Sequence, residues 1–178
     1  MGVIFVETKI PGAFVVEPER QEDERGFFAR TFSEDAFRER GLESNFVQCS
    51  ISSNAKKGTL RGMHYQIAPH EEAKLVRCTM GSILDIILDL RVGSPTFRQW
   101  VGTRLSASNR LLHYVPKGCA HGFQSLEDDT EVFYQISEYY HPECARGVRW
   151  DDPAFGIQWP DAPSVISIKD RQYPGFVT

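Results

Sequence analysis

The sequence contains no long apolar run. A membrane-spanning helix needs about 20 consecutive apolar residues, whereas the longest such stretch here, Ser82 to Leu90, is interrupted by Asp85 and Asp89. The N-terminal apolar stretch ends at Glu7 and is too short for the apolar region of a signal peptide. We therefore expect neither a membrane span nor an export signal, and a cytoplasmic location.

Cysteines are few and widely spaced. The four of them lie at positions 49, 78, 119 and 144, with no close pair. That spacing gives no indication of a zinc-binding or redox motif. In a chain without an export signal we expect all four to be free thiols.

The chain also lacks an excess of basic residues. Lys and Arg number 20 and Asp and Glu number 24, so the formal net charge is −4. This balance gives no sign of nucleic-acid binding, although a small anionic ligand needs only a few local Arg or Lys residues. There is no internal repeat or low-complexity tract, and we expect residues 1–178 to form a single domain.

Short elements are expected throughout, because 14 glycines and 10 prolines interrupt the chain. The clearest helix candidate is Ser33–Gly41, in which Ser33 suits the N-cap and Gly41 the C-terminus. From Phe46 to Tyr140 the sequence predicts almost only strands of 5–8 residues. The tail from Asp151 onward is expected to be an irregular covering segment with one short helix.

The strand pattern predicts an all-β sandwich or barrel. Two of its apolar runs, Lys74–Met80 and Ile83–Leu90, flank Gly81-Ser82, which is typical of a hairpin turn. We therefore expect these two strands to pair with each other.

The most specific local pattern is Pro116-Lys-Gly-Cys-Ala-His121, a tight turn that delivers a histidine onto the next strand. It resembles the second motif of the cupin jelly-roll family, whose first motif supplies two alternate histidines and a carboxylate to a metal. The matching stretch here is Gly62-Met-His64-Tyr-Gln66, with Gln66 in place of the second histidine. Glutamine is a poor transition-metal ligand beside imidazole, and Glu71 and Glu72 lie in a charged segment expected to be exposed. The sequence therefore predicts no catalytic metal, and a metal-dependent cupin remains the second hypothesis.

Without a metal, the interior positions of such a barrel become acid–base groups. Alternate residues of a strand share one face, so His64 and Lys74 could face one cavity, with Tyr134 on another strand. A histidine with an ordinary pKa near 6.5 suits proton removal at neutral pH, a lysine suits a developing oxyanion, and a tyrosine delivers a proton. The combination fits proton abstraction next to a carbonyl. By contrast, His70, His113 and His141 lie in no motif and are predicted to be structural or exposed.

Eight blocks in order resemble the dTDP-4-dehydrorhamnose 3,5-epimerase family, over about residues 3–172. The blocks are Arg25-Gly-Phe-Phe28, Leu60–Gln66, Lys74–Arg77, Asp89-Leu-Arg91, Ser94–Phe97, Pro116–Phe123, Arg149–Pro153 and Lys169-Asp-Arg171. The resemblance implies a cupin-like jelly-roll fold and a cofactor-independent epimerase acting on a nucleotide-diphosphate 4-keto-6-deoxy sugar. It also implies a homodimer that exchanges N-terminal β-structure.

The resemblance assigns roles to residues at matching positions. In the catalytic group, His64 matches the base, Asp170 the carboxylate that orients it, Tyr134 the proton donor on the opposite sugar face and Lys74 the group beside the C4 oxygen. In the substrate-binding group, Arg25, Arg61 and Lys169 match cations around the diphosphate and sugar, His121 a pocket contact and Gln48 a nucleotide contact. Phe27 or Tyr139 is the candidate for stacking on the base.

Several positions depart from the family pattern. Arg30 and Ala145 stand where glutamates are common, and Cys49-Ser50 replaces Asp-Asn. These differences leave open the nucleotide (dTDP, CDP or GDP), the sugar, and whether one or both of C3 and C5 are inverted. A non-catalytic sugar-nucleotide binding module is a third hypothesis, which the set of His64, Lys74 and Tyr134 argues against because binding alone does not require it.

Overall fold

The computed structural model describes residues 2–176, which form short strands and two short helices. The elements are β1 (Val3–Glu7), β2 (Phe14–Pro18), β3 (Arg20–Asp23), β4 (Gly26–Ala29), α1 (Glu34–Arg38), β5 (Gln48–Asn54), β6 (Thr59–Gln66), β7 (Lys74–Met80), β8 (Ser82–Asp89), β9 (Trp100–Ser106), β10 (Leu112–Val115), β11 (Cys119–Ser125), β12 (Thr130–Ile136), β13 (Ala145–Gly147), β14 (Val165–Ile166) and α2 (Ile168–Arg171). None of the helices in this part of the chain has the length and apolar character that crossing a membrane requires.

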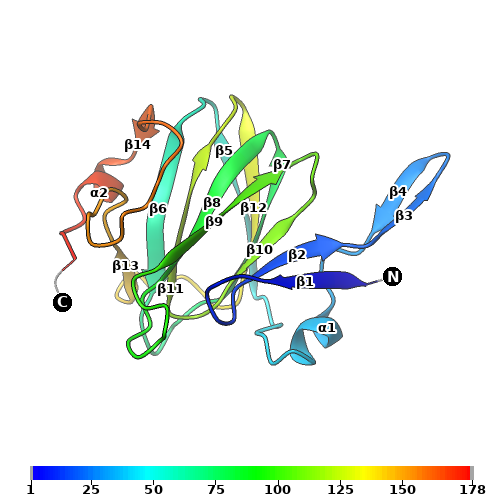
Figure 1. Cartoon of the computed structure of the whole chain (residues 1–178), viewed down its shortest axis with the longest axis horizontal. Helices are drawn as coiled ribbons and strands as arrows, with labels where there is room; N and C mark the ends of the chain where they lie inside the picture. Colours follow the sequence, from blue (N-terminus) through cyan, green and yellow to red (C-terminus); the bar gives the residue numbers. More distant parts are fainter. Residues whose placement is uncertain (1, 177–178) are drawn as a thin grey trace.

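Two large sheets lie face to face (Figure 1). One has the order β1-β2-β10-β7-β12-β5, and the other has the order β13-β6-β11-β8-β9 with β14 added beside β6. Every pairing is antiparallel except that of β14 with β6. This arrangement confirms the predicted all-β, cupin-like jelly roll.

The space between the sheets is filled by apolar side chains from both. Ile83 and Ile87 of β8 and Phe123 of β11 pack against Val76 of β7 and Val132 of β12, and all five are almost completely buried. Each strand contributes its inward-facing positions, as period-2 alternation requires. The core therefore joins the two sheets and leaves the end nearer α2 free for a cavity.

The hairpin predicted for Lys74–Met80 and Ile83–Leu90 is wrong. β7 pairs with β10 and β12, whereas β8 pairs with β11 and β9 in the other sheet. Gly81 does reverse the chain, at a φ of +74°, but the reversal crosses the sandwich. Both runs carry buried apolar faces, and crossing lets each face the shared core from a different wall.

The predicted helix near residue 33 is confirmed as α1, although it covers only Glu34–Arg38 and Ser33 makes no side-chain cap hydrogen bond. Its Phe37 is fully buried among aromatic rings, including Phe5 and Tyr114, with centroids 4.9 and 5.7 Å away. The predicted short helix in the tail is confirmed as α2.

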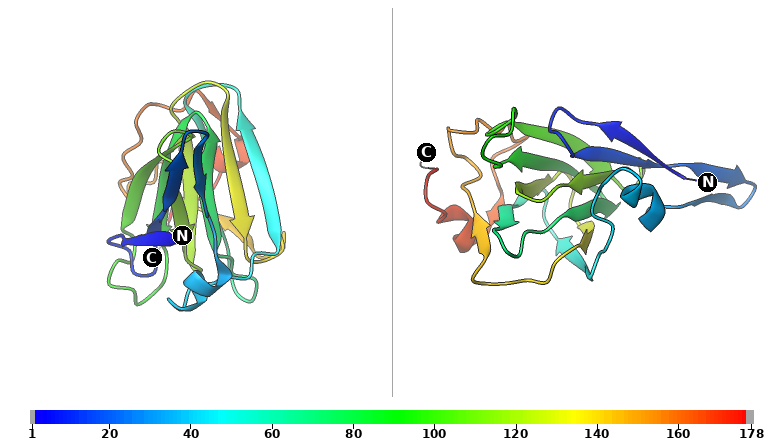
Figure 2. Two further views of the ribbon diagram at one scale, coloured as in Figure 1. Left: turned by 90° about the vertical axis from the view of Figure 1, so that its right-hand side faces the viewer. Right: turned by 90° about the horizontal axis from the view of Figure 1, so that it is seen from below.

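The ribbon formed by β3 and β4 stands apart from the sandwich. Figure 2 shows it projecting beyond the two sheets at the end opposite α2 and the C-terminal segment. Within residues 2–176 the two strands pair only with each other, and nearly all their residues are exposed. Such a ribbon has no core of its own, and two-stranded hairpins are marginally stable in isolation.

Candidate active site

A cavity of about 610 Å³ lies between the two sheets. Its walls come from β5, β7 and β12 of one sheet, from β6, β11 and β13 of the other, and from β14 and α2. Eight of the residues singled out from the sequence line it: His64, Lys74, Tyr134, Asp170, Gln48, Arg61, His121 and Lys169. The structure thus gathers residues from both sheets and the C-terminal segment around one space.

His64 is held by a carboxylate from the far end of the chain. Its Nε2 lies 2.7 Å from Oδ1 of Asp170, which is buried while the His64 side chain is 40% exposed. An ionised carboxylate only accepts hydrogen bonds, so Nε2 of His64 donates this one, and in the neutral ring the free lone pair is on Nδ1. This is the arrangement of a histidine base with its orienting acid.

Asp170 is kept ionised by its surroundings. Burial by itself raises the pKa of this carboxyl, but the hydrogen bond and charge of His64, together with donation from the Gly62 amide, outweigh burial and lower the pKa. The Ser167 hydroxyl accepts from the Asp170 backbone amide as the N-cap of α2. The short helix therefore fixes the position of the carboxylate.

Two glycines make room around this pair. A Cβ on Gly62, whose φ is +137°, would lie 2.6 Å from the Cα of Gly122, so β6 and β11 approach each other closely beside His64. A Cβ on Gly147 would meet the ring of Tyr173 at 2.2 Å. That ring lies 6.1 Å from the His64 ring, edge to face. Larger residues at either glycine would displace the wall of the cavity.

Lys74 lies inside the cavity and is paired there. Its Nζ is 2.8 Å from Oε1 of Glu72, and each side chain is only 11% exposed. The expectation that Glu72 lies in an exposed segment is therefore wrong: the chain turns inward before β7, so residues 72 and 74, two apart, both line the cavity. The i, i+2 spacing of Glu72 and Lys74 in the sequence could have indicated that both face the same side of the chain.

Tyr134 presents its hydroxyl from β12, in the same sheet as Lys74 and opposite the sheet of His64. Its oxygen lies 3.3 Å from the Ser52 hydroxyl of β5. Burial raises the pKa of this phenol, despite the opposing hydrogen bond with Ser52, so the group stays protonated well above neutral pH. Ser52 was missed from the sequence, although Gln48, Ser50 and Ser52 alternate along β5 and all three line the cavity.

His121 is bound to a buried carboxylate rather than left free. Its Nε2 lies 2.7 Å from Oδ1 of Asp85, whose Oδ2 lies 2.8 Å from Nδ1 of His113. All three residues are almost completely buried. Burial lowers the pKa of His121, so its ring is neutral at pH 7. Asp85 thus fixes the ring behind Tyr134, at 6.2 Å between centroids.

The Gln66 amide is held by backbone groups of two loops. Its side-chain nitrogen donates to the carbonyls of His70 and Tyr139, and its oxygen accepts from the His141 amide. Asp85 likewise occupies Nε2 of His121. Both side chains are therefore engaged in hydrogen bonds within the protein, and glutamine is in any case a poor transition-metal ligand beside imidazole.

Three predicted binding residues lie elsewhere in this chain. Arg25 and Phe27 belong to the β3–β4 ribbon, where Arg25 pairs with Asp23 and is 84% exposed. Tyr139 is exposed, while its neighbour Tyr140 lines the cavity. Their proposed roles in binding stay predictions.

Known proteins resemble this chain over nearly its whole length. Residues 7–177 match the family model described as dTDP-4-dehydrorhamnose 3,5-epimerase. The enzyme of that name from Methanothermobacter thermautotrophicus is 45% identical over 172 residues, or 95% of this chain and 92% of that one.

Two solved structures share the fold. That of the dTDP-4-dehydrorhamnose 3,5-epimerase from Bacillus anthracis, with TDP and PPi bound, aligns with a TM-score of 0.94 and 40% identity over 98% of this chain and 100% of that one. That of a 3′-monoepimerase from Streptomyces bikiniensis, in complex with dTDP-quinovose, has a TM-score of 0.86 and 33% identity over 94% and 85% of the two chains.

Replacing Asp170 with Asn is expected to lower the free energy of unfolding near pH 7 by about 1–3 kcal/mol, because the buried carboxylate interactions are lost. The folded-state pKa of Asp170 is lowered, so its contribution is present above the unfolded pKa of about 4 and lost as the pH falls through the folded value. Urea unfolding between neutral and acid pH should therefore show the difference between Asp170→Asn and wild type shrinking below pH about 4.

The matched control is Asp151→Asn, which removes an exposed carboxylate paired with Arg149. It should change stability by no more than about 0.5 kcal/mol. If the difference in free energy of unfolding between Asp170→Asn and wild type stays constant down to the most acid pH, Asp170 does not have a lowered pKa in the folded protein.

Proposed function

The chain belongs to the dTDP-4-dehydrorhamnose 3,5-epimerase family, and we propose that it converts dTDP-4-dehydro-6-deoxy-glucose to dTDP-4-dehydro-rhamnose by inverting C3 and C5. Members of this family are isomerases that need no cofactor. One observation carries the proposal: His64 on β6 and Tyr134 on β12 line one cavity from facing sheets. Inversion needs a base on one side of the sugar ring and an acid on the other.

The chemistry follows from the substrate's ketone. Protons at C3 and C5 are acidic because each carbon neighbours the C4 carbonyl. In the proposed reaction Nδ1 of His64 removes such a proton, and the electron pair moves to the C4 oxygen as an enolate. The protonated hydroxyl of Tyr134 then delivers a proton to the opposite face of the same carbon. His64 then releases its proton to water and the Tyr134 oxygen takes one up from water, which restores both groups. The same two steps at the second carbon complete the double inversion.

Lys74 is proposed to donate to the enolate oxygen. A single donor of this kind is typically worth about 2.7–4 kcal/mol of transition-state stabilisation. The Glu72 carboxylate, 2.8 Å away, holds the ammonium group in place within the cavity. Its charge also balances that of Lys74, so the largely buried lysine is not left unpaired.

The remaining cavity residues suit an anionic nucleotide. Arg61, Arg146 and Lys169 bring positive charge to the wall, which matches a diphosphate. Gln48 and Ser50 offer polar groups to the base or its sugar. The dTDP nucleotide is proposed because the B. anthracis relative binds TDP; CDP and GDP sugars are the alternatives from the sequence.

We also propose a homodimer in which each β3–β4 ribbon reaches the partner's cavity. The ribbon projects away from the sandwich of its own chain (Figure 2) and presents Arg25 and Phe27 far from the site that the sequence assigns them to. The exposed apolar residues Ile4 and Val6 of the edge strand β1 offer a surface for a second copy. Closed two-fold dimers are the commonest assembly.

The reaction is tested by proton NMR in D₂O with the purified chain and dTDP-4-dehydro-6-deoxy-glucose. Deuterium is expected at both C3 and C5, accompanied by the signals of the inverted sugar. Exchange at one centre alone would identify a single-site epimerase, as in the S. bikiniensis relative. No exchange with the dTDP sugar, with exchange of a CDP or GDP sugar, would overturn the choice of nucleotide.

The His64→Asn variant is expected to lose about 10²–10⁴-fold in exchange rate, because the base is removed. Tyr134→Phe should keep deuterium exchange and lose inversion, because only reprotonation on the far face is affected. Both rates come from the same NMR assay, with circular dichroism as the check on folding. Exchange at the wild-type rate in His64→Asn, or normal inversion in Tyr134→Phe, would contradict the respective role.

The dimer is tested by complementation. Arg25→Ala and His64→Asn chains should each be nearly inactive, while a reassembled mixture should recover about one quarter of wild-type activity, because half of the two-fold dimers then contain one intact site. Light scattering should give twice the chain mass of 20.3 kDa. A mixture no more active than its separate components would show that the ribbon does not act across the dimer.

A further inference from the structure

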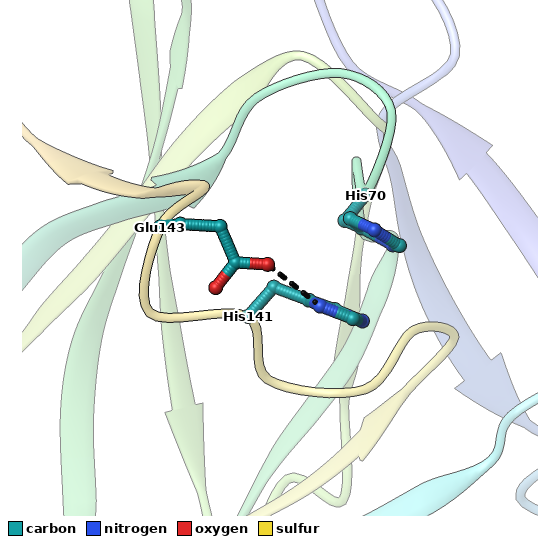
Figure 3. A group of neighbouring side chains, drawn as sticks. All are labelled: His70, His141 and Glu143. Carbon is teal, nitrogen blue, oxygen red and sulfur yellow. Dashed lines mark hydrogen bonds and ion pairs between the residues drawn. The ribbon is translucent and has the colours of Figure 1, made fainter.

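A cluster of histidines and glutamates lies outside the cavity. His70 comes from the loop after β6, and His141 and Glu143 come from the loop before β13 (Figure 3). One ligand atom from each of these three residues lies within 4.8 Å of the others. Neither the sequence motifs nor the proposed reaction uses any of them.

A fourth residue completes the cluster. Oε2 of Glu138 lies 3.6 Å from Nδ1 of His70, and its Oε1 lies 4.0 Å from Nε2 of His141. Glu143 approaches Nδ1 of His141 at 3.2 Å. Two imidazoles are therefore flanked by two carboxylates. Nδ1 of His70 is buried and has no hydrogen-bond partner in the part of the chain that the structure describes.

We propose that His70, His141, Glu143 and Glu138 form a binding site for a divalent transition metal, with Zn²⁺ as the representative ion. Two imidazoles and one or two carboxylates make a common ligand set for zinc. Imidazole ligands favour Zn²⁺, Ni²⁺ or Cu²⁺ over Mg²⁺ and Ca²⁺, which prefer oxygen alone. The proposal concerns metal binding and does not depend on the proposed epimerase reaction.

The scaffold of the site is already fixed by one buried side chain. Gln66 holds the His70 carbonyl with its nitrogen at 3.0 Å and the His141 amide with its oxygen at 2.7 Å. The two histidines come from loops 71 residues apart in sequence (141 − 70) and are nevertheless tied to the same amide group. Most of the ordering needed to bring the two ligands together is therefore done before a metal arrives.

Metal binding requires the two rings to turn. They are now stacked, with centroids 3.4 Å apart and an interplanar angle of 11°. A metal lies in the plane of each imidazole that it binds, so two parallel rings one above the other cannot share an ion. Both side chains are about 30% exposed, at 32% and 29%, which leaves room to rotate. Loss of the stack is a structural signature that separates metal binding from simple ion pairing.

The site would also fix the rim of the cavity. Tyr140, which lines the cavity, lies between Tyr139, whose carbonyl accepts from Gln66, and His141. An ion shared by the two loops would restrain this segment on both sides. We therefore expect the metal to stabilise the rim rather than to take part in the chemistry.

The test is titration of the metal-free full-length chain with Zn²⁺ by calorimetry, with Co²⁺ absorption as a report on ligand geometry. We expect one ion per chain and a visible Co²⁺ spectrum typical of low coordination number. In proton NMR of the wild type, the imidazole signals of His70 and His141 should move, and those of the buried His113 and His121 should not.

His70→Gln and His141→Gln should each weaken Zn²⁺ binding at least about 100-fold, because even outer-shell changes cost 10–100-fold. His64→Asn serves as the location control and should bind Zn²⁺ like the wild type, since it removes a cavity histidine that does not belong to the cluster. Metal-free thermal unfolding of each variant checks that the fold is retained.

Three results of the titrations would overturn the proposal, and a fourth comes from the NMR spectra. They are the absence of saturable binding, binding that is unchanged in both glutamine variants, and binding that is lost in His64→Asn. Imidazole signals that stay fixed while Zn²⁺ binds would likewise place the ion elsewhere.

Discussion

Most turns between β5 and β13 carry the chain across the sandwich rather than back along the same sheet, and this crossing determines where the chemistry lies. Strands β5, β7, β10 and β12 lie in one sheet, and β6, β8, β11 and β13 lie in the other. Residues that are neighbours in sequence therefore end on opposite walls. His64 and Lys74 are ten positions apart and face one cavity from different sheets.

The same crossing marks the limit of what the sequence predicts. Period-2 alternation correctly located the strands, because it depends only on which face of a strand is buried. It could not identify the partner of each strand, so Gly81 was interpreted as the turn of a hairpin. The likeness of the Leu60–Gln66, Pro116–Phe123 and Lys169–Arg171 blocks to known motifs was needed to expect His64, His121 and Asp170 in one site. Glu72 was wrongly predicted to be exposed. Charge and proline content indicate the average exposure of a segment, whereas a single carboxylate paired with Lys74 can be buried.

Three largely buried carboxylates near the cavity each have their own hydrogen-bonding or ion-pair partner. Asp170 has His64, Glu72 has Lys74, and Asp85 has two imidazoles, one of which extends to the Thr103 hydroxyl at 3.1 Å. Each carboxylate keeps a cavity group in a defined orientation, and its own burial would be unfavourable without that partner. The positions of the reactive groups are therefore a consequence of the hydrogen bonds that these buried carboxylates need.

Gln66 shows why a single substitution to histidine would not convert this jelly roll into a metal-dependent cupin. At the position where a cupin places a metal ligand, this chain has an amide whose three hydrogen bonds join two loops. A histidine there could not reproduce all three bonds, because its ring offers only one donor and one acceptor. Replacing Gln66 with a metal-binding histidine would therefore also release the loops that carry His70 and His141.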